Sequence, residues 1–234
     1  MPNTYFSFKK FTIHHDKCAM KVGTDGVLLG AWADVSESKN ILDIGTGTGL
    51  ISIMLAQRSH AYITGIDIDS GAVEQAKENA SASPWSDRIE ICLADVNQYT
   101  PSLTFDTIVS NPPFFIDSLK CPDQQRNTAR HTDTLTMADL FGKAYCLLSA
   151  NGHFSLIIPF DQTPQIIQTA ERVGLYPSRH TKVHTRPGIP PKRSLLEFSK
   201  VQSICNEEDI TIELERHVYS EEYIALTKEF YLKM

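Results

Sequence analysis

Asn40-Ile-Leu-Asp-Ile-Gly-Thr-Gly-Thr-Gly49 runs directly into Leu50-Ile-Ser-Ile-Met-Leu-Ala-Gln57. The apolar run before the glycines predicts a buried strand, and the segment after them has apolar residues along one face of a helix. Glycine lets the connecting turn bend sharply and approach a ligand without side chains in the way. The start of the helix adds unpaired backbone N–H groups. We therefore predict a strand, a ligand-binding turn and a helix, which together indicate an α/β protein.

Acidic side chains mark the strands around this turn. Asp43 precedes the glycines, Asp67 lies near the end of the run 62–68, and Asp95 ends the run 88–95. A carboxylate at the end of the second strand can bind both ribose hydroxyls of an adenosine cofactor. The alternative for each acid is a helix N-cap, a position that favours Asp by itself. Asp69 and Ser70 are better placed to cap the next helix, so we expect the Asp67 carboxylate to be free.

The fourth predicted strand, 105–110, leads into Asn111-Pro112-Pro113-Phe114. The carboxyl edge of an open parallel sheet is where ligands bind. There the Asn111 side-chain oxygen can accept a hydrogen bond from an amine, and the Pro112 carbonyl is a second acceptor in a rigid backbone. Phe114 offers a face on which a planar base can stack. The alternative is an ordinary turn, which Asn-Pro commonly starts. The group predicts a pocket for an exocyclic amine on a flat ring.

The rest of the chain keeps alternating strands and helices, which indicates a parallel sheet with helices on both faces. Residues 116–134 form a polar loop that is long enough for a functional lid. Further helices are predicted at about 137–148, 163–173 and 221–232, and further strands at about 152–159, 194–199 and 209–214.

Composition narrows the class of protein. A chain of 234 residues with 41% hydrophobic residues can bury a full core. No apolar run reaches the ~18 residues needed to span a bilayer, and the N-terminus does not resemble a signal peptide. The five cysteines, at 18, 92, 121, 146 and 205, form no Cys-x-x-Cys pair and indicate neither a disulfide framework nor a zinc site. We expect a cytoplasmic protein with no metal, no membrane association and no obligate protein partner.

The Gly-x-Gly-x-Gly turn, preceded by an acid, resembles the first motif of the class I S-adenosylmethionine-dependent methyltransferases. The dinucleotide fingerprint Gly-x-Gly-x-x-Gly has its third glycine one residue later. The order of the glycine turn, Asp67, Asp95 and Asn111 is also that of the methyltransferase family. The resemblance implies S-adenosyl-L-methionine as cofactor, with Asp95 near its adenine. It also implies an α/β fold with a doubly wound, seven-stranded, mostly parallel Rossmann-like sheet, whose antiparallel seventh strand we assign to 194–199.

Longer stretches are similar to the bacterial tRNA adenine-N6 methyltransferases that modify a valine tRNA next to its anticodon. These stretches are 11–32, 83–88, 110–115 and 219–232, and the most distinctive part is 21–29. Because the similarity covers essentially the whole chain, we expect one methyltransferase domain at 1–234. Its parts would be a cofactor- and substrate-flanking segment at 1–39, a Rossmann-like core at 40–200 and a C-terminal extension at 201–234.

The resemblance also assigns the site residues. The residues expected at the cofactor are Lys21, Thr24, Asp25, Asp43, Gly45, Gly47, Gly49, Asp67, Asp95 and Asn111. The residues expected to carry catalysis are Asn111, Pro112, Pro113 and Phe114. The implied reaction methylates the N6 amine of the adenosine 3′ of the anticodon, tRNA position 37, after the base has been flipped out of its stack.

Other substrates and other classes of protein remain as alternatives. Phe114 stands where many adenine-N6 enzymes have Tyr, and Phe also occurs there in guanine-N2 rRNA methyltransferases. Glutamine-N5 protein methylation is a further alternative, because a glutamine amide also presents a flat amine. A nicotinamide-dependent oxidoreductase could use a similar glycine turn, and a catalytically idle RNA-binding module would need no reaction at all.

Charge is unevenly distributed along the chain. A net charge of −6 conflicts with the cations that phosphate contacts require. Eight acids follow Cys205, however, whereas none lies between Arg172 and Leu196. Basic runs flank the expected pocket, which favours a tRNA-binding rim over a merely solvated surface. The predicted tRNA-binding residues are Arg126, Arg130, Arg179, Lys182, Arg186, Lys192 and Arg193.

Overall fold

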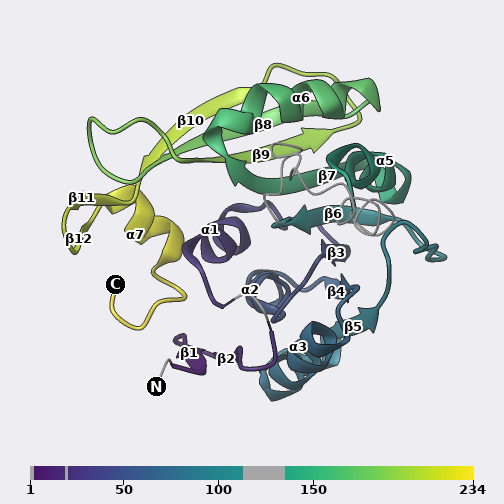
Figure 1. Cartoon of the computed structure of the whole chain (residues 1–234), viewed down its shortest axis with the longest axis horizontal. Coiled ribbons are helices and arrows are strands. Elements are labelled where there is room, and N and C mark those ends of the chain that lie inside the picture. Colours follow the sequence, from purple (N-terminus) through teal and green to yellow (C-terminus); the bar gives the residue numbers. More distant parts are fainter. Residues whose placement is uncertain (1–2, 19–20, 113–134) are drawn as a thin grey trace, which may run out of the picture.

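An eight-stranded, mostly parallel sheet forms the centre of the protein (Figure 1). The computed structural model describes residues 3–18, 21–112 and 135–234. The strand order is β10-β8-β9-β7-β6-β3-β4-β5, which runs from top to bottom in Figure 1. The strands are β3 (Asn40–Ile44), β4 (Tyr62–Asp67), β5 (Ile89–Leu93), β6 (Phe105–Ser110), β7 (Leu148–Pro159), β8 (Tyr176–His184), β9 (Arg193–Ser199) and β10 (Asn206–Thr211).

Helices cover both faces of the sheet, as predicted. Successive side chains of a strand point to opposite faces, so a parallel strand between two helical layers is apolar almost throughout. In β3, Ile41 packs in the core with α1 and α2, whereas Leu42 and Ile44 pack in the core with α5 and α6. These helices are α1 (Thr24–Trp32), α2 (Leu50–Arg58), α5 (Met137–Leu147) and α6 (Thr163–Arg172).

The sheet has one strand more than predicted. The antiparallel strand expected at 194–199 is confirmed as β9, which runs antiparallel to both β7 and β8. The additional strand is β10, which extends the sheet by pairing in parallel with β8. It shares the predicted acidic strand 209–214 with a separate short strand, β11 (Glu213–Glu215), which pairs with β12 (Val218–Tyr219). Most side chains of β10 are exposed, so no apolar alternation in the sequence could reveal its partner.

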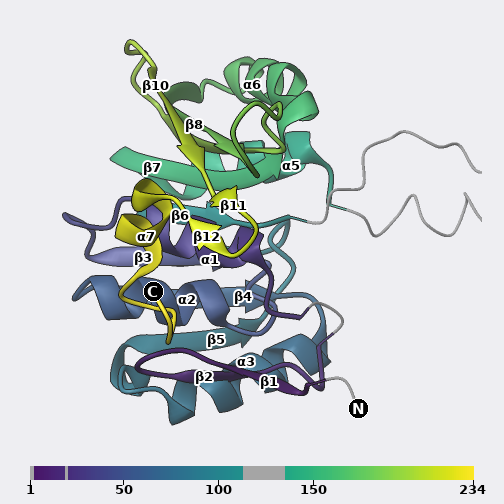
Figure 2. The same cartoon turned by 90° about the vertical axis from the view of Figure 1, so that its left-hand side faces the viewer.

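The segments near the two ends of the chain lie together, beside α1 and α2 (Figures 1 and 2). A hairpin of β1 (Tyr5–Ser7) and β2 (Thr12–His14) precedes the sheet. The Lys9 N–H donates a hydrogen bond to the Phe230 carbonyl at 2.8 Å. The Phe230 ring is 2% exposed and packs with Phe8 and Phe11 of the hairpin segment.

The last helix, α7 (Glu221–Thr227), is shorter than the predicted 221–232. Ser220 caps its start by accepting a hydrogen bond from the Tyr223 N–H. The N–H groups of Phe230 and Tyr231 both return to the Thr227 carbonyl, at 2.9 and 3.3 Å, which closes a turn in place of a further helical turn. The tail leaves the helix axis there, and the Phe230 ring becomes buried.

Candidate functional site

The carboxyl ends of β3, β4, β5 and β6 lie side by side along one edge of the sheet. In the register, Ile44 lies opposite both Ile66 and Ser110, and Asp67 lies opposite Leu93. The glycine turn, Asp67, Asp95 and Asn111 follow directly from these strand ends. The structure therefore brings these predicted residues to one edge, which is the ligand-binding edge of an open α/β sheet.

The glycine turn has a backbone that only glycine adopts readily. Gly45, Gly47 and Gly49 have φ angles of 72°, 55° and 79°, all in the left-handed region. The N–H groups of Gly45 and Thr46 donate to the Ile66 carbonyl, at 2.9 and 3.0 Å, which ties the turn to β4. Gly49 is the N-cap of α2 and makes no side-chain cap. Within the first turn of this helix, the Ser52 N–H donates to Asp43 Oδ2 at 3.2 Å, whereas the N–H groups of Leu50 and Ile51 have no acceptor among the described residues.

The Asp43 side chain fixes the glycine turn through hydrogen bonds. Its carboxylate is fully buried, and Oδ2 accepts hydrogen bonds from Thr46 Oγ1 at 2.8 Å and from Ser52 Oγ at 2.7 Å. The other oxygen, Oδ1, is buried without a hydrogen-bond partner among the described residues. Burial raises the pKa of Asp43 to about 6, against the hydrogen bonds from Ser52 and Thr46 that lower it.

Asp67 is not free, contrary to our expectation. Its Oδ2 accepts a hydrogen bond from the Gly47 N–H at 2.9 Å, and its Oδ1 accepts one from the Asp69 N–H at 3.0 Å. The expected capping role of Asp69 is confirmed, since its side chain accepts from the Ala72 N–H at the start of α3 (Ser70–Ala82). Each carboxylate oxygen has a second lone pair, so Asp67 can anchor the turn and still accept a ribose hydroxyl.

Asp95 stands just beyond the strand that was expected to contain it. The predicted strand 88–95 is β5, which ends at Leu93. The Asp95 side chain then accepts a hydrogen bond from the Asn97 N–H at 2.8 Å, which shapes the turn after the strand. Its carboxylate is half-buried at the same edge as Asp67.

Asn111 carries an unsatisfied acceptor. The preceding residue, Ser110, donates its hydroxyl to the Ile44 carbonyl at 2.8 Å, which ties the end of β6 to the glycine turn. Asn111 Oδ1 is buried and has no hydrogen-bond partner among the described residues. A buried acceptor without a donor is costly, so this oxygen is suited to an amine brought by a ligand. Pro112 is buried beside it, whereas Pro113 and Phe114 lie outside the described residues.

The predicted residues of the N-terminal segment lie at the start of α1. Lys21 and Thr24 are exposed there. Asp25 forms an ion pair with Arg193, with 2.8 Å between Oδ2 and Nε. Asp25, which we expected at the cofactor, is thus the ion-pair partner of Arg193, which we expected at the tRNA. This pair joins the start of α1 to the start of β9.

Several of the predicted tRNA-binding residues are paired with acids. Parallel pairing of β8 with β10 places the acidic strand directly beside the basic one, so Lys182 Nζ lies 2.7 Å from Glu207. Arg186 is 3.3 Å from Glu213. Exposed pairs of this kind contribute only about 0–1 kcal/mol, so a phosphate can replace the acid. Predicted residues Arg126 and Arg130 lie outside the described residues.

Arg179 differs from the other basic residues. Its guanidinium lies 3.7 Å from the centre of the Trp32 ring and 3.3 Å from Glu197, whose side chain is nearly buried. Arg179 stands in the first half of β8, whereas Arg186, Lys192 and Arg193 lie beyond its carboxyl end. Arg193 pairs with Pro159 at the carboxyl end of β7, on the edge that holds Asn111. Three of the basic residues therefore lie at the same edge of the sheet as the candidate site, whereas Arg179 packs on Trp32.

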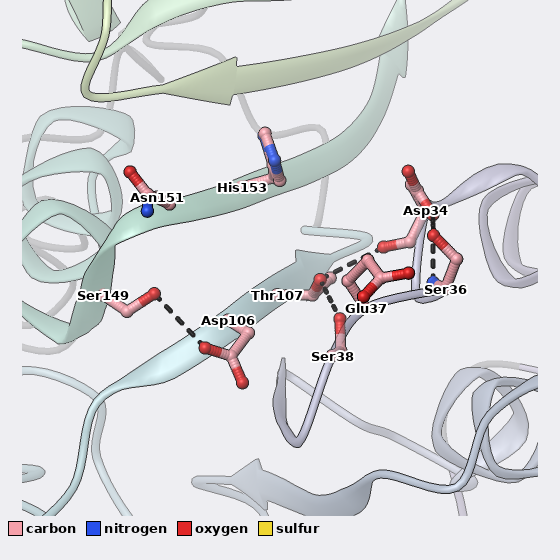
Figure 3. Close-up of a pocket in the computed structure, with 9 residues that line it drawn as sticks. All are labelled: Asp34, Ser36, Glu37, Ser38, Asp106, Thr107, Ser149, Asn151 and His153. Carbon is pink, nitrogen blue, oxygen red and sulfur yellow. Dashed lines mark hydrogen bonds between the residues drawn. The ribbon is translucent and has the colours of Figure 1, made fainter.

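A separate hollow of about 210 Å³ lies at the opposite edge of the sheet (Figure 3). Its lining includes Asp106 and Thr107 at the start of β6, and His153 in the first half of β7. The hydroxyl groups of Ser38 and Thr107 are 2.8 Å apart, and Ser149 donates to Asp106 at 3.3 Å. Asp34, Glu37 and Asp106 make this hollow acidic, and it lies away from the glycine turn, Asp67 and Asn111.

Sequence reasoning missed the residues that support the turn. Thr46 and Ser52 hold Asp43, and the Asn79 side chain reaches the Thr48 carbonyl at 2.9 Å. Asn79 and Gln75 are each 1% exposed. They lie among the small apolar residues of α3, and a pair of amides four residues apart on such a helix is the signal that could have identified them.

Comparison with known proteins places the chain in a family. Residues 20–169 match the family model described as methyltransferase small domain. A tRNA1(Val) (adenine(37)-N6)-methyltransferase from Phocaeicola vulgatus is 62% identical over 234 residues, which cover 100% of both chains. The chain belongs to the tRNA1(Val) (adenine(37)-N6)-methyltransferase family. Proteins of the same name from Bacteroides fragilis and Flavobacterium psychrophilum are 55% and 47% identical and are each covered in full, over 100% and 98% of this chain.

Solved structures agree on the fold of this methyltransferase. A predicted O-methyltransferase from Agrobacterium tumefaciens matches with a TM-score of 0.67 and 22% identity, over 88% of this chain and 96% of that chain. A glycopeptide N-methyltransferase complexed with S-adenosyl-L-methionine matches with a TM-score of 0.57 and 12% identity, over 77% and 100%. At such identities the likeness shows the class I methyltransferase fold alone.

Two further features concern the described part of the chain. None of its helices has both the length and the apolar character needed to span a bilayer. None of its clusters of His, Cys, Asp and Glu side chains is arranged to hold a metal ion.

Proposed function

We propose that this protein transfers a methyl group from S-adenosyl-L-methionine to the N6 amine of adenine 37 in a valine tRNA. The observation that carries this proposal is the 62% identity, over the full length of both chains, to the tRNA1(Val) enzyme of Phocaeicola vulgatus. We further propose that residues 1–234 act as one domain, with the flanking segment 1–39 and the extension 201–234 both serving the core at 40–200.

The carboxyl edge of the sheet fits the cofactor. The glycine turn exposes backbone without side chains, and the Asp67 carboxylate keeps lone pairs for ribose hydroxyls beyond its two backbone bonds. Asp43 Oδ1 is a buried acceptor with no hydrogen-bond partner among the described residues. When bound, S-adenosyl-L-methionine supplies a methyl group activated on a sulfonium sulfur. Lys21, Thr24 and Asp95 complete the proposed binding residues.

The adenine amine is a poor nucleophile because its lone pair is delocalised into the ring. In our proposal, Asn111 Oδ1 and the Pro112 carbonyl accept hydrogen bonds from its two N–H groups and favour the pyramidal nitrogen that exposes the lone pair. Phe114 stacks on the flipped-out base. Positioning supplies much of the rate. No general base is needed before transfer, because the nitrogen becomes acidic only afterwards.

The proposed tRNA surface lies beside this pocket. Arg186 and Lys192 belong to the loop between β8 and β9, and Arg193 opens β9 at the same edge. We assign phosphate contacts to these residues together with Lys182, Arg126 and Arg130. Contacts to phosphates position the RNA and carry no sequence information themselves.

Labelled methyl transfer to unmodified bulk tRNA, followed by nucleoside mass spectrometry, tests the proposal. The expected product is N6-methyladenosine, and a transcript of the valine tRNA with guanosine at position 37 should accept no label. N2-methylguanosine as the product would contradict the adenine assignment. Label appearing only in added protein, at glutamine, would overturn the tRNA substrate.

A further inference from the structure

Two buried amide side chains on α3 face the N-terminal segment. Asn79 and Gln75 are each 1% exposed. Four residues apart on a helix, they lie on one face. A buried amide is costly unless it is hydrogen-bonded, and both of these amides are bonded to the N-terminal segment.

Asn79 holds two separate parts of the chain at once. Its Oδ1 accepts a hydrogen bond from the His14 N–H at 2.9 Å, and its Nδ2 donates to the His14 carbonyl at 2.9 Å. The amide thus pairs with both backbone groups of His14, as a neighbouring strand would. The other N–H of Nδ2 reaches the Thr48 carbonyl, inside the glycine turn, at 2.9 Å. One acceptor and two donors are all used, and this set of partners permits only one orientation of the amide.

Gln75 makes the next contact along the same helix. Its Oε1 accepts from the Lys17 N–H at 3.1 Å. The Lys17 ammonium lies 2.7 Å from Glu74 and 2.6 Å from Glu78. Residues 14–17 therefore follow α3 from its C-terminal half towards its first turn, as the path of the chain after β2 in Figure 2 also shows. The Cys18 sulfur then comes within 3.9 Å of the point where a Cβ on Gly47 would stand.

We propose that Asn79 is a positioning residue of the cofactor site, which fixes the glycine turn at Thr48 and couples it to residues 14–18. This inference rests on the proposed function, in which the turn binds S-adenosyl-L-methionine. Glycine-rich backbone loses much conformational freedom when it is ordered. Because the Asn79 hydrogen bonds order the turn before the ligand binds, binding no longer has to supply the full entropic cost of ordering it. Asn79 itself touches neither cofactor nor substrate.

Calorimetric titration with S-adenosyl-L-methionine and S-adenosylhomocysteine tests the positioning role of Asn79. Asn79→Ala, and Asn79→Asp, which keeps the acceptor but loses both donors, should each weaken binding by about tenfold. In turnover, the KM for the cofactor should rise by the same factor, while kcat and the KM for tRNA stay within about twofold. Gln75→Ala is the matched control, because it removes a contact to the N-terminal segment and leaves the Thr48 carbonyl bonded.

The outcomes distinguish failure of the positioning role of Asn79 from failure of the proposed function. If the unaltered protein bound neither ligand, the proposed function would fail first. If it bound both and the two Asn79 variants bound equally well, the positioning role would be overturned and the proposed function would stand. Hydrogen exchange of the unaltered protein covers the case of variants that do not fold. Adding S-adenosylhomocysteine should slow exchange of the His14 amide, and unchanged exchange there would equally overturn the coupling.

Discussion

The side-chain oxygen of Asn111 is buried, and no described residue donates a hydrogen bond to it. Replacement by Ala should abolish methyl transfer, because the amine would lose the acceptor that holds its N–H bond. Cofactor affinity should remain nearly intact, since in our proposal this oxygen contacts the substrate. Single-turnover methylation of tRNA and calorimetry with S-adenosyl-L-methionine measure the two effects. Asn97→Ala, an exposed amide at the same edge, serves as control, and a variant at position 111 with most of the original rate would refute the role.

Asp67 anchors the turn and faces the proposed ribose site. Asp67→Ala should weaken S-adenosyl-L-methionine binding by ~1.5–3 kcal/mol, the range for hydrogen bonds to a charged group. Asp69→Ala is the matched control, because it removes the cap of α3 and costs about 1 kcal/mol of stability while leaving the Asp67 carboxylate in place. Equal affinity in calorimetry for Asp67→Ala and the unaltered protein would make Asp67 purely structural.

The contribution of Asp43 to the free energy of unfolding should depend on pH. Burial raises its pKa to about 6 from 3.8. The folded protein then holds this proton more tightly than the unfolded chain does. The contribution of Asp43 to the free energy of unfolding is therefore highest below about pH 4, falls between about pH 4 and 6, and stays constant above. The total fall is about 3 kcal/mol, since one pKa unit corresponds to 1.36 kcal/mol.

Asp43→Asn removes this titration. Urea unfolding of both proteins between pH 4 and 7 gives a difference that isolates Asp43 from the other acids. We expect the free energy of unfolding of the variant to gain on that of the unaltered protein as the pH rises from about 4 to 6. Parallel profiles across that range would show that the folded protein ionises Asp43 at its ordinary pKa.

The pairing of β8 with β10 brings acidic side chains of one strand beside basic side chains of the other. The acids after Cys205 do not form a remote patch, because Glu207 and Asp209 lie within 2.7 Å of Lys182 and His184. The loop between β8 and β9 adds Arg186, which is paired with Glu213, and Lys192. Lys192 in this loop is exposed, and among the described residues no acid lies within ion-pair distance of it.

Charge reversal in this loop tests its role. Arg186→Glu combined with Lys192→Glu should strongly raise the dissociation constant for tRNA, because two phosphate contacts become repulsive. The slope of affinity against salt concentration should flatten by about one unit per lost contact. Binding of S-adenosyl-L-methionine should not change. Filter binding at several salt concentrations measures both effects.

Lys39→Glu is the control for that experiment, since Lys39 is exposed at the opposite end of β3 from the glycine turn. Unchanged tRNA affinity and salt slope in the double variant would leave the loop as a solvated surface. The glutamine-amide substrate would then have to be considered again.

At the scale of the whole molecule, the two ends of the chain depend on each other. Phe230 fills the core between α1, α2 and the hairpin, together with Phe8 and Phe11. Phe230→Ala should lower the free energy of unfolding by about 3–5 kcal/mol, the usual cost of emptying a buried aromatic site. Denaturant unfolding measures it. Leu232→Ala, at a side chain 59% exposed, should cost less than about 0.5 kcal/mol. A loss for Phe230→Ala as small as that for Leu232→Ala would show that the tail is not part of the core.

Local patterns of residues were enough to predict the elements around the candidate site and their order. Apolar runs predicted β3, β4 and β6, and glycine spacing predicted the turn, because strand burial and left-handed backbone each demand particular residue types locally. The identity of Asn111 as an acceptor at a strand end also needed no coordinates. Even the antiparallel β9 followed from the resemblance that these motifs carried.

Which side chains are bonded to which partners depends on how the chain packs in three dimensions. β10 is polar and could have stood alone, but backbone pairing with β8 placed its acids against Lys182 and His184. The Asp67 carboxylate proved to be bonded to Gly47 and Asp69, and Asn79 joined His14 to Thr48 across distant parts of the chain. A side-chain hydrogen bond between residues far apart in sequence has no periodicity. Its partners are settled only when packing brings them within about 3 Å.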